Sequence, residues 1–228
     1  MSGWTAGGPR RVLAVVAIGA VGGWPAGCTP VPSGLHEDTP KQVYCLRGLW
    51  DVFSTGLDSL AVEMRERGLA AESLSGPLWP DLAERIEKAS HEQSLNGDLV
   101  LVGHSFGAEH ALRLAFRLQQ QGIPVGLMVL IDATTPPPIP SNVARCVHLY
   151  IPSPLASLAP DVFPGRPVEL AEGNDRTELV NWVVTPAEFG PVNHFNLESN
   201  PVVHQVVIDE VLAIRTGPAP GAACRTRP

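Results

Sequence analysis

The sequence predicts a doubly wound α/β domain, in which helices cover both faces of a mostly parallel sheet. Short, almost wholly apolar runs of strand length recur along the chain, and amphipathic helical patterns separate them. No internal repeat is visible. A chain of 228 residues with 44% hydrophobic residues is long enough for one domain with a sizeable buried core.

The expected elements begin after residue 40 and alternate between strand and helix. In chain order they are a strand over 41–47, a helix over 57–67, a strand over 69–74, a helix over 80–90, a strand over 99–102 followed by a helix to about 121, strands over 125–131, 147–151, 168–170 and 178–184, and a helix over 201–214. The run over 125–131, VGLMVLI, has the apolar content of a strand that is buried on both faces.

Residues 1–28 have the features of an export signal and are set aside from the fold. Arg10 and Arg11 precede an apolar run over 12–21 that is too short to cross a bilayer comfortably. The small residues before Cys28 resemble the lipobox of bacterial lipoproteins, although Pro25 stands where that motif usually has leucine. We therefore expect export and a lipid on Cys28, with cleavage to a soluble secreted form as the alternative.

The expected mature chain has three parts. A proline-rich tether over 29–40 leads to the domain over 41–216, and a disordered tail follows over 217–228. The predicted location is the cell envelope, on the periplasmic or the outer surface, with the membrane as a partner through the lipid anchor. The sequence leaves the oligomeric state open.

Composition argues against several classes of function. A formal charge of −7 offers no basic face to nucleic acid, and no glycine-rich phosphate-binding loop is present. The Cys and His spacings suggest no metal site, and no cofactor is implied. Cys45 and Cys146 lie in apolar runs and are expected to be small buried side chains, while Cys224 lies in the tail.

A G-x-S-x-G motif, Gly103 to Gly107, lies between the strand over 99–102 and the next helix. A strand, this motif and a helix together form a nucleophile elbow, a sharp turn that lifts a serine oxygen above the strand ends. The glycines let strand and helix approach closely around Ser105, whose backbone is strained. In a chain with 22 glycines the bare motif could arise by chance, but its position favours Ser105 as a nucleophile.

A serine nucleophile needs a histidine base, and His194 is the best candidate. It lies in a loop between the last strand and the last helix, where such a base is expected. His110 lies on the helix after the motif, and His204 has spacing compatible with solvent. His148 lies inside a strand pattern, which favours a satisfied core or sheet-face role. A capping or turn role is the alternative for His194.

The acid that orients the base is expected to be Asp132, at the carboxyl end of the strand over 125–131. A buried charge at a strand end is costly unless it is paired, and an imidazole would pair it. A turn-initiating aspartate is the alternative reading. Four acidic residues after the following strand compete for the role: Asp161, Glu169, Glu172 and Asp175.

The stretch GHSFGAEHALRLAFRLQQQGIPVGLMVLIDATTP, residues 103–136, resembles the core of the α/β-hydrolase superfamily, and in particular the thioesterase domains of peptide and polyketide synthases. The resemblance implies Ser105 as nucleophile, Asp132 as acid and His194, within Asn193-His194-Phe195, as base. It extends over about 42–214 but is strong only over 99–136. It also implies the α/β-hydrolase fold.

Two departures from that family modify the expectation. The usual His-Gly-Gly-Gly loop is replaced by Arg47-Gly48-Leu49-Trp50, so the oxyanion hole would use the N–H of Phe106 and one from Leu49 or Trp50. The short loop after Asp132 leaves no room for the lid of synthase thioesterases, so a minimal, lidless domain is expected.

These observations predict a serine hydrolase that acts on a small-molecule carboxylic ester or thioester through an acyl-enzyme. The alternative is a non-catalytic envelope lipoprotein that uses the same scaffold for binding. The identity of the substrate and the length of its acyl group are not encoded in a readable pattern.

Overall fold

The computed structural model describes residues 42–48, 54–95, 97–153 and 164–216. Contacts divide the chain into the units Met1–Glu37 and Asp38–Pro228, and all described residues belong to the second. The predicted export signal, Cys28, the tether and the tail therefore lie outside the described residues. Within the described ranges, no helix is both long and apolar enough to cross a membrane.

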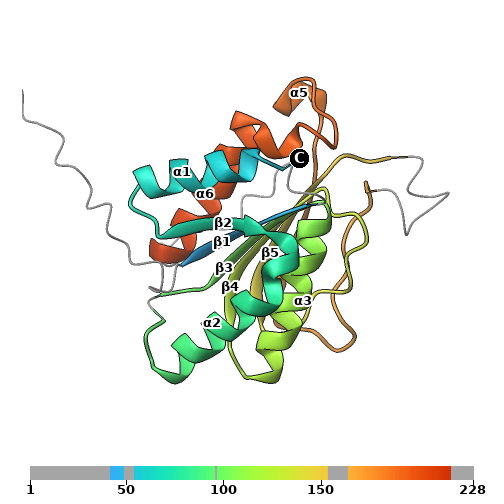
Figure 1. Ribbon diagram of the computed structural model, residues 1–228. Coiled ribbons are helices and arrows are strands. Elements are labelled where there is room, and N and C mark those ends of the chain that lie inside the picture. The colour runs from blue at the N-terminus through green and yellow to red at the C-terminus, as the bar shows by residue number, and fades with distance from the viewer. Residues whose placement is uncertain (1–41, 49–53, 96, 154–163, 217–228) are drawn as a thin grey trace, which may run out of the picture. The chain divides into compact units, whose positions relative to one another are not determined.

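The domain is built on one six-stranded sheet whose strands are all parallel (Figure 1). The strands are β1 (Val43–Arg47), β2 (Ala71–Ser75), β3 (Val100–His104), β4 (Val125–Ile131), β5 (Val143–Tyr150) and β6 (Glu178–Val183). Their order is β2-β1-β3-β4-β5-β6, so the chain first winds outward to β2 and then returns to the other side of β1. This reversal puts the switch point between β1 and β3, where the crevices of such sheets form.

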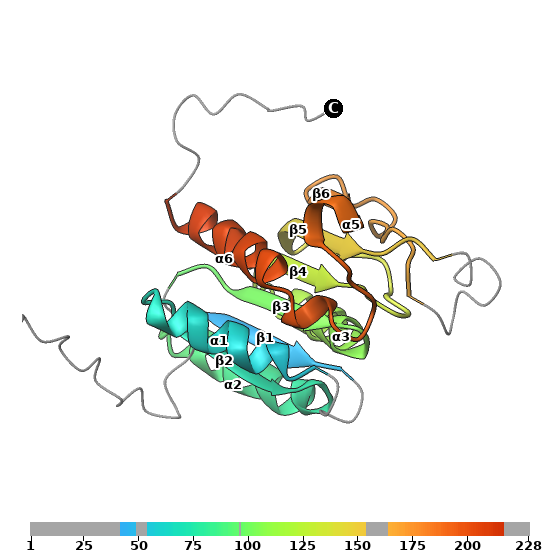
Figure 2. The ribbon, with the colours of Figure 1, turned by 90° about the horizontal axis from the view of Figure 1, so that it is seen from above.

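Helices cover both faces of the sheet. The helices are α1 (Gly56–Glu66), α2 (Trp79–His91), α3 (Phe106–Gln120), α5 (Pro186–Phe189) and α6 (Pro201–Thr216), with the short 3-10 turns η1 (Gly76–Leu78) and η2 (Leu197–Ser199). Helices α1 and α6 lie on one face, and α2 and α3 on the other (Figures 1 and 2). This architecture confirms the predicted fold class.

The alternation of side chains along each strand explains the two cores. In β1, Val43 and Cys45 pack with α1 and α6, whereas Tyr44 and Leu46 pack with α2 and α3. Strand β3 divides in the same way, and its five residues are all buried. A sheet covered on both faces needs apolar residues at every position, which is why the strand patterns are continuous rather than alternating.

The two free cysteines of the described chain, Cys45 and Cys146, are buried as the sequence predicts. Burial raises the pKa of the Cys45 thiol to about 12 and also raises that of Cys146. Both side chains therefore act as small apolar residues of the core.

Strand β5 and the segment over 168–170 differ from the sequence prediction. Strand β5 begins at Val143, before the predicted start at 147, and pairs with both β4 and β6. The predicted strand over 168–170 is wrong. Its backbone is bound by a side chain: Asn181 Oδ1 accepts from Val168 N–H at 2.9 Å, and Asn181 Nδ2 donates to Val168 O at 3.0 Å. Leu170 forms only an isolated bridge with Ile139.

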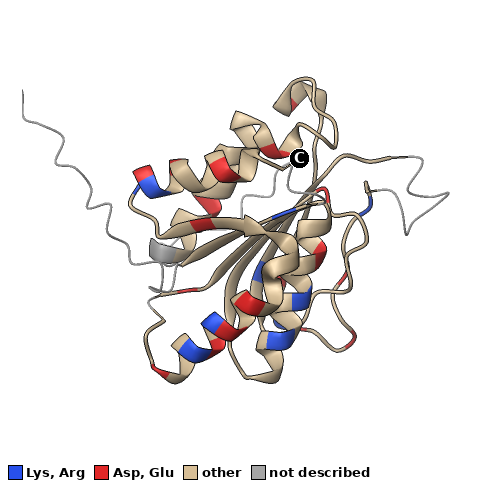
Figure 3. Cartoon of the chain, in the orientation of Figure 1, with Lys and Arg blue, Asp and Glu red and all other residues tan. Residues whose placement is uncertain are grey.

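The connection between β4 and β5, every residue of which is described, contains no helix. No lid is inserted there, in agreement with the sequence prediction. Charged residues of both signs lie along α2 and α3 (Figure 3), where ion pairs join Arg117 to Glu87 and Arg113 to Glu109.

Candidate active site

Ser105, His194 and Asp132 form one hydrogen-bonded row at the carboxyl ends of β3 and β4. Ser105 Oγ lies 3.0 Å from His194 Nε2, and His194 Nδ1 lies 2.8 Å from Asp132 Oδ2. Because the carboxylate can only accept, Nδ1 carries the proton in a neutral ring and Nε2 is left to accept from the serine. The three residues that the sequence singled out are thus brought together in the order that base-assisted nucleophilic attack requires.

The turn that carries Ser105 is strained and tightly packed. Ser105 has φ +56°, in the left-handed region that non-glycine residues rarely occupy, and its N–H donates to Ile131 O at 3.0 Å. A Cβ on Gly103 would lie 2.5 Å from Gly107 O, and one on Gly107 would overlap the carbonyl oxygen of Leu46. The glycines are therefore required because strand, turn and helix lie in direct backbone contact.

Asp132 also has a left-handed backbone, with φ +43°, directly after β4. Its N–H donates to Leu149 O at 2.7 Å, and its Oδ1 accepts from Ile151 N–H at 3.2 Å. The carboxylate is buried, and both of its oxygens have partners, as buried polar groups require. One oxygen accepts from the backbone just after β5, and the other faces the imidazole. Of its competitors, Asp161 lies outside the described residues, and the other three are exposed: Glu169, Glu172 and Asp175.

His194 lies in a loop between α5 and η2 that two asparagines brace. Asn196 Oδ1 accepts from Asn193 N–H at 2.7 Å, and Asn193 Oδ1 accepts from Phe195 N–H at 2.8 Å. The aromatic ring of Phe195 is 67% exposed and meets the His194 imidazole edge-on, with 5.3 Å between the ring centroids. These contacts hold His194 at the edge of an accessible surface.

A buried histidine that the sequence analysis did not single out connects the segments around Ser105. His104 Nε2 donates to the backbone oxygen of His194 at 2.9 Å, and its Nδ1 accepts from Ser54 Oγ at 2.8 Å. Ser54 Oγ in turn accepts from Gly48 N–H at 3.1 Å. Since the acceptor atoms fix the tautomer, a neutral His104 joins the loop after β1, strand β3 and the loop that carries His194.

Two more polar residues lie beside the row, namely Thr134, which the sequence analysis missed, and His148. Thr134 Oγ1 lies 3.1 Å from Ser105 Oγ, and His148 Nε2 accepts from Ala133 N–H at 3.3 Å. His148 is otherwise the satisfied sheet residue that the pattern predicted, with Nδ1 at 3.3 Å from Asn181 Oδ1. No sequence spacing relates Thr134 to Ser105, because their contact depends on the pairing of β3 with β4.

His110 and His204 lie outside this row. His110 lies on α3 as predicted, but the prediction of a solvent-compatible His204 is wrong, because its side chain is buried. Its Nδ1 lies 2.9 Å from Glu63 Oε1, and its Nε2 lies 2.8 Å from Glu198 O. His204 precedes Val207 and Ile208 by three and four residues, so helical geometry puts it on their buried face.

The predicted oxyanion donors are described only in part. Phe106 is the first residue of α3, where helix N–H groups have no acceptor within the helix and the helix dipole is positive. Leu49 and Trp50 lie outside the described residues. Their neighbour Gly48 lies against Ser105, since a Cβ there would be 3.2 Å from Ser105 Cβ.

Burial lowers the pKa of His148 to about 4, and burial together with the nearby His194 lowers that of His104 to about 4 as well. Both imidazoles are therefore neutral near pH 7, as their hydrogen bonds require. In the unfolded chain the pKa of a histidine is about 6.5, so at lower pH the unfolded state binds protons that the folded state does not.

We expect the free energy of unfolding to fall as the pH drops from about 6.5 towards 4, by about 3 kcal/mol for each of these two imidazoles. Urea denaturation at a series of pH values measures this loss. His104→Gln is expected to remove one proton from the difference in proton uptake between the unfolded and the folded state. An identical pH dependence in the wild type and His104→Gln would contradict this prediction.

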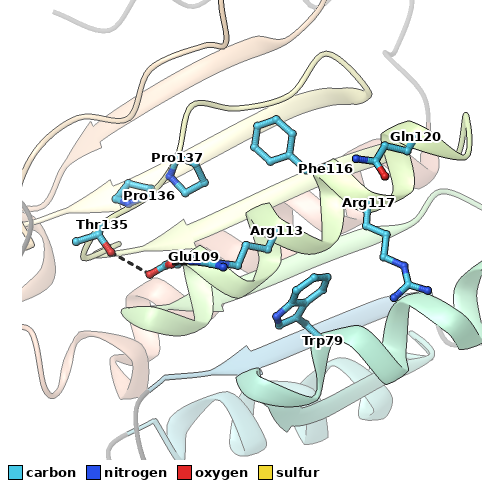
Figure 4. Close-up of a pocket in the computed structure, with 9 residues that line it drawn as sticks. All are labelled: Trp79, Glu109, Arg113, Phe116, Arg117, Gln120, Thr135, Pro136 and Pro137. Carbon is cyan, nitrogen blue, oxygen red and sulfur yellow. Dashed lines mark hydrogen bonds and ion pairs between the residues drawn. The ribbon is translucent and has the colours of Figure 1, made fainter.

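A separate open pocket of about 600 Å³ lies over α2, α3 and the loop after β4 (Figure 4). Its lining residues are Trp79, Glu109, Arg113, Phe116, Arg117, Gln120, Thr135, Pro136 and Pro137. The Thr135 hydroxyl donates to Glu109 at 2.9 Å, and Glu109 also pairs with Arg113. None of the three residues of the row lines this pocket. Among the described residues, no cluster of His, Cys, Asp or Glu could hold a metal ion.

Residues 53–141 match the sequence model of the thioesterase domain family. This stretch includes the strand–turn–helix that carries Ser105, together with Asp132. No curated protein matches the chain.

Several solved structures are similar to the chain at low identity. A hydrolase of the α/β superfamily from Xanthomonas campestris is 14% identical, with 76% of this chain and 99% of that chain covered and a TM-score of 0.42. Human thioesterase 2 is 12% identical, with 75% and 93% covered and a TM-score of 0.44. The thioesterase of the prodiginine pathway in Streptomyces coelicolor is 14% identical, with 74% and 83% covered and a TM-score of 0.42.

The match to the thioesterase domain family covers the segment that carries Ser105 and Asp132, and this segment lies within a doubly wound parallel α/β sheet.

Proposed function

We propose that the chain is a serine hydrolase that cleaves a carboxylic ester or a thioester through an acyl-enzyme. The row Ser105 Oγ, His194 Nε2, His194 Nδ1 and Asp132 Oδ2, with separations of 3.0 and 2.8 Å, is the observation that carries the proposal. An imidazole between a serine and a buried carboxylate is the arrangement that activates a hydroxyl for attack on an acyl carbon.

In the first half of the reaction, Ser105 Oγ attacks the carbonyl carbon while its proton passes to His194 Nε2. Asp132 stabilises the resulting imidazolium, and the N–H of Phe106 with one from Leu49 or Trp50 stabilises the oxyanion. The tetrahedral intermediate then collapses, and His194 returns the proton to the departing alcohol or thiol. Ser105 is left acylated.

In the second half, water takes the place of the leaving group. His194 accepts a proton from the water as the water oxygen attacks the acyl carbon. It then donates a proton to Ser105 Oγ as the carboxylic acid product is released. These steps balance without a metal or an organic cofactor. The exposed ring of Phe195 and the absence of a lid between β4 and β5 support small-molecule acyl substrates that enter from solvent.

The test combines a fluorophosphonate probe with a panel of chromogenic esters and thioesters of graded acyl length. We expect the wild type to be labelled on Ser105 and to turn over part of the panel, and Ser105→Ala to do neither. Ser141→Ala is the matched control, because this hydroxyl lies before β5 and pairs with Gln119 instead. If wild type and Ser105→Ala behave alike, the scaffold serves for binding, as in the alternative of an envelope lipoprotein.

We also propose that the protein is exported and anchored to the cell envelope through a lipid on Cys28. The short apolar run over 12–21 and the small residues before Cys28 support this. Expression in a bacterial host with radiolabelled fatty acid is expected to label the wild type and not Cys28→Ala. Equal labelling of the two would exclude Cys28 as the anchor, and a soluble, unlabelled wild-type product would favour secretion.

A further inference from the structure

The nucleophile has a second hydroxyl beside it that the usual three-residue row does not include. Thr134 Oγ1 lies 3.1 Å from Ser105 Oγ, and both side chains are buried. We propose that Thr134 is a catalytic residue: its hydroxyl donates a hydrogen bond to Ser105 Oγ and stabilises the negative charge that this oxygen carries during attack and departure. The inference rests on the proposed function, because it assigns a role within the same reaction.

Counting protons gives the direction of this hydrogen bond. Ser105 Oγ has one proton and two neighbours, His194 Nε2 at 3.0 Å and Thr134 Oγ1 at 3.1 Å. A serine poised for attack donates its proton to Nε2, since that nitrogen must accept it. The proton between the two hydroxyls must then come from Thr134, so the Thr134 hydroxyl donates and Ser105 Oγ accepts.

Backbone hydrogen bonds from the two residues before Thr134 hold its loop in place. Asp132 N–H donates to Leu149 O at 2.7 Å, and Ala133 N–H donates to the buried ring of His148 at 3.3 Å. Thr134 itself is 4% exposed, so little water competes for its hydroxyl. A donor fixed in advance at a reacting atom costs no reorganisation when charge develops on that atom.

The donated bond strengthens at the steps where Ser105 Oγ is most negative. During acylation the oxygen gains charge as its proton moves to His194, and during deacylation it gains charge again as its bond to the acyl carbon breaks. In the acyl-enzyme the same atom is an ester oxygen and a poor acceptor, so the bond from Thr134 is weak there. The interaction therefore favours the transition states over the covalent intermediate.

The opposite orientation would have the opposite effect on the rate. If Ser105 donated to Thr134, the serine proton would point away from His194, and Thr134 would hold the nucleophile in an unreactive state. Removing the threonine hydroxyl would then speed attack instead of slowing it. The two orientations can thus be distinguished by the sign of a single rate change.

The experiment measures the rate constant for fluorophosphonate labelling, which reports attack by Ser105 without deacylation. Thr134→Val and Thr134→Ala are expected to be labelled about 10- to 100-fold more slowly than the wild type, as for loss of one hydrogen bond to a charged atom. Thr134→Ser keeps the hydroxyl and is expected to stay within a few-fold of the wild type. Since the Ser and Ala variants both lack the methyl group, their comparison isolates the hydroxyl.

Thr135→Val is the matched control on the same loop, because the Thr135 hydroxyl donates to Glu109 and not to the nucleophile. We expect its labelling rate to equal that of the wild type. Thermal unfolding of each variant shows whether it is folded at the temperature of the assay.

The pH dependence of labelling separates a chemical role from a displaced base. Thr134 is uncharged, so its loss is expected to lower the plateau rate and to leave the apparent pKa of the acid limb unchanged. Labelling of Thr134→Val and Thr134→Ala at or above the wild-type rate would overturn the inference, as would a shifted acid limb that accounts for the loss. If the wild type is not labelled on Ser105 at all, the proposed function fails instead.

Discussion

Replacing Asp132 by asparagine is expected to lower kcat/KM for a thioester or ester substrate by about 10³- to 10⁴-fold. The carboxylate accepts a hydrogen bond from His194 Nδ1–H at 2.8 Å and is 2% exposed, so no water can replace it readily. An amide at this position can turn its NH₂ group towards Nδ1, which favours the tautomer whose Nε2 carries the proton. That ring cannot accept the proton of Ser105.

Steady-state kinetics of Asp132→Asn measures this loss, and most of it should appear in kcat. The matched controls are Glu169→Gln, Glu172→Gln and Asp175→Asn, which alter exposed carboxylates and are expected to retain full activity. If activity is retained in Asp132→Asn but lost in one of these three variants, the residue changed in that variant is the acid. The imidazole would then have to turn away from β4.

Gly107→Ala is expected to destabilise the domain by about 2–3 kcal/mol or more, although alanine is normally better than glycine inside a helix by about 1 kcal/mol. The reason is backbone contact, because a Cβ on this residue of α3 would overlap the carbonyl oxygen of Leu46 in β1 and lie 2.8 Å from the carbonyl carbon of Arg47. Neither group can move without shifting the sheet.

Urea denaturation of wild type, Gly107→Ala and Gly122→Ala tests this prediction. Gly122 has φ +69° with nothing within 4 Å of an added Cβ, so its replacement adds conformational strain alone, of about 1 kcal/mol. The loss at Gly107 should be clearly larger and should be accompanied by lower activity. A more stable Gly107→Ala would show that α3 can move away from β1.

The parts of the fold that the sequence predicts well are those in which one local pattern dominates. Strand β4 has the predicted bounds, Val125–Ile131, because every residue of a strand buried on both faces must be apolar or small. The start of β5 was predicted too late, since Arg145 interrupts the apolar run. Its guanidinium pairs with Glu178 and Glu210 at the edge of the sheet, so a charged residue fits within this strand.

The residues of the candidate site also differ in whether a local sequence pattern reveals them. Ser105, Asp132 and His194 could be proposed from chain order and from their positions at strand ends, and the structure brings them within hydrogen-bond distance. His104 and Thr134 could not be found in this way, because their contacts join segments whose proximity only the folded sheet creates. The sequence carries no local signal for a contact of that kind.

The two left-handed residues, Ser105 and Asp132, follow directly after neighbouring strands whose last residues, His104 and Ile131, are paired in register. The spacing between Ser105 and Asp132 is therefore set by one step of the β3–β4 ladder. We expect changes of length in surface loops elsewhere in the chain to leave this spacing unaltered.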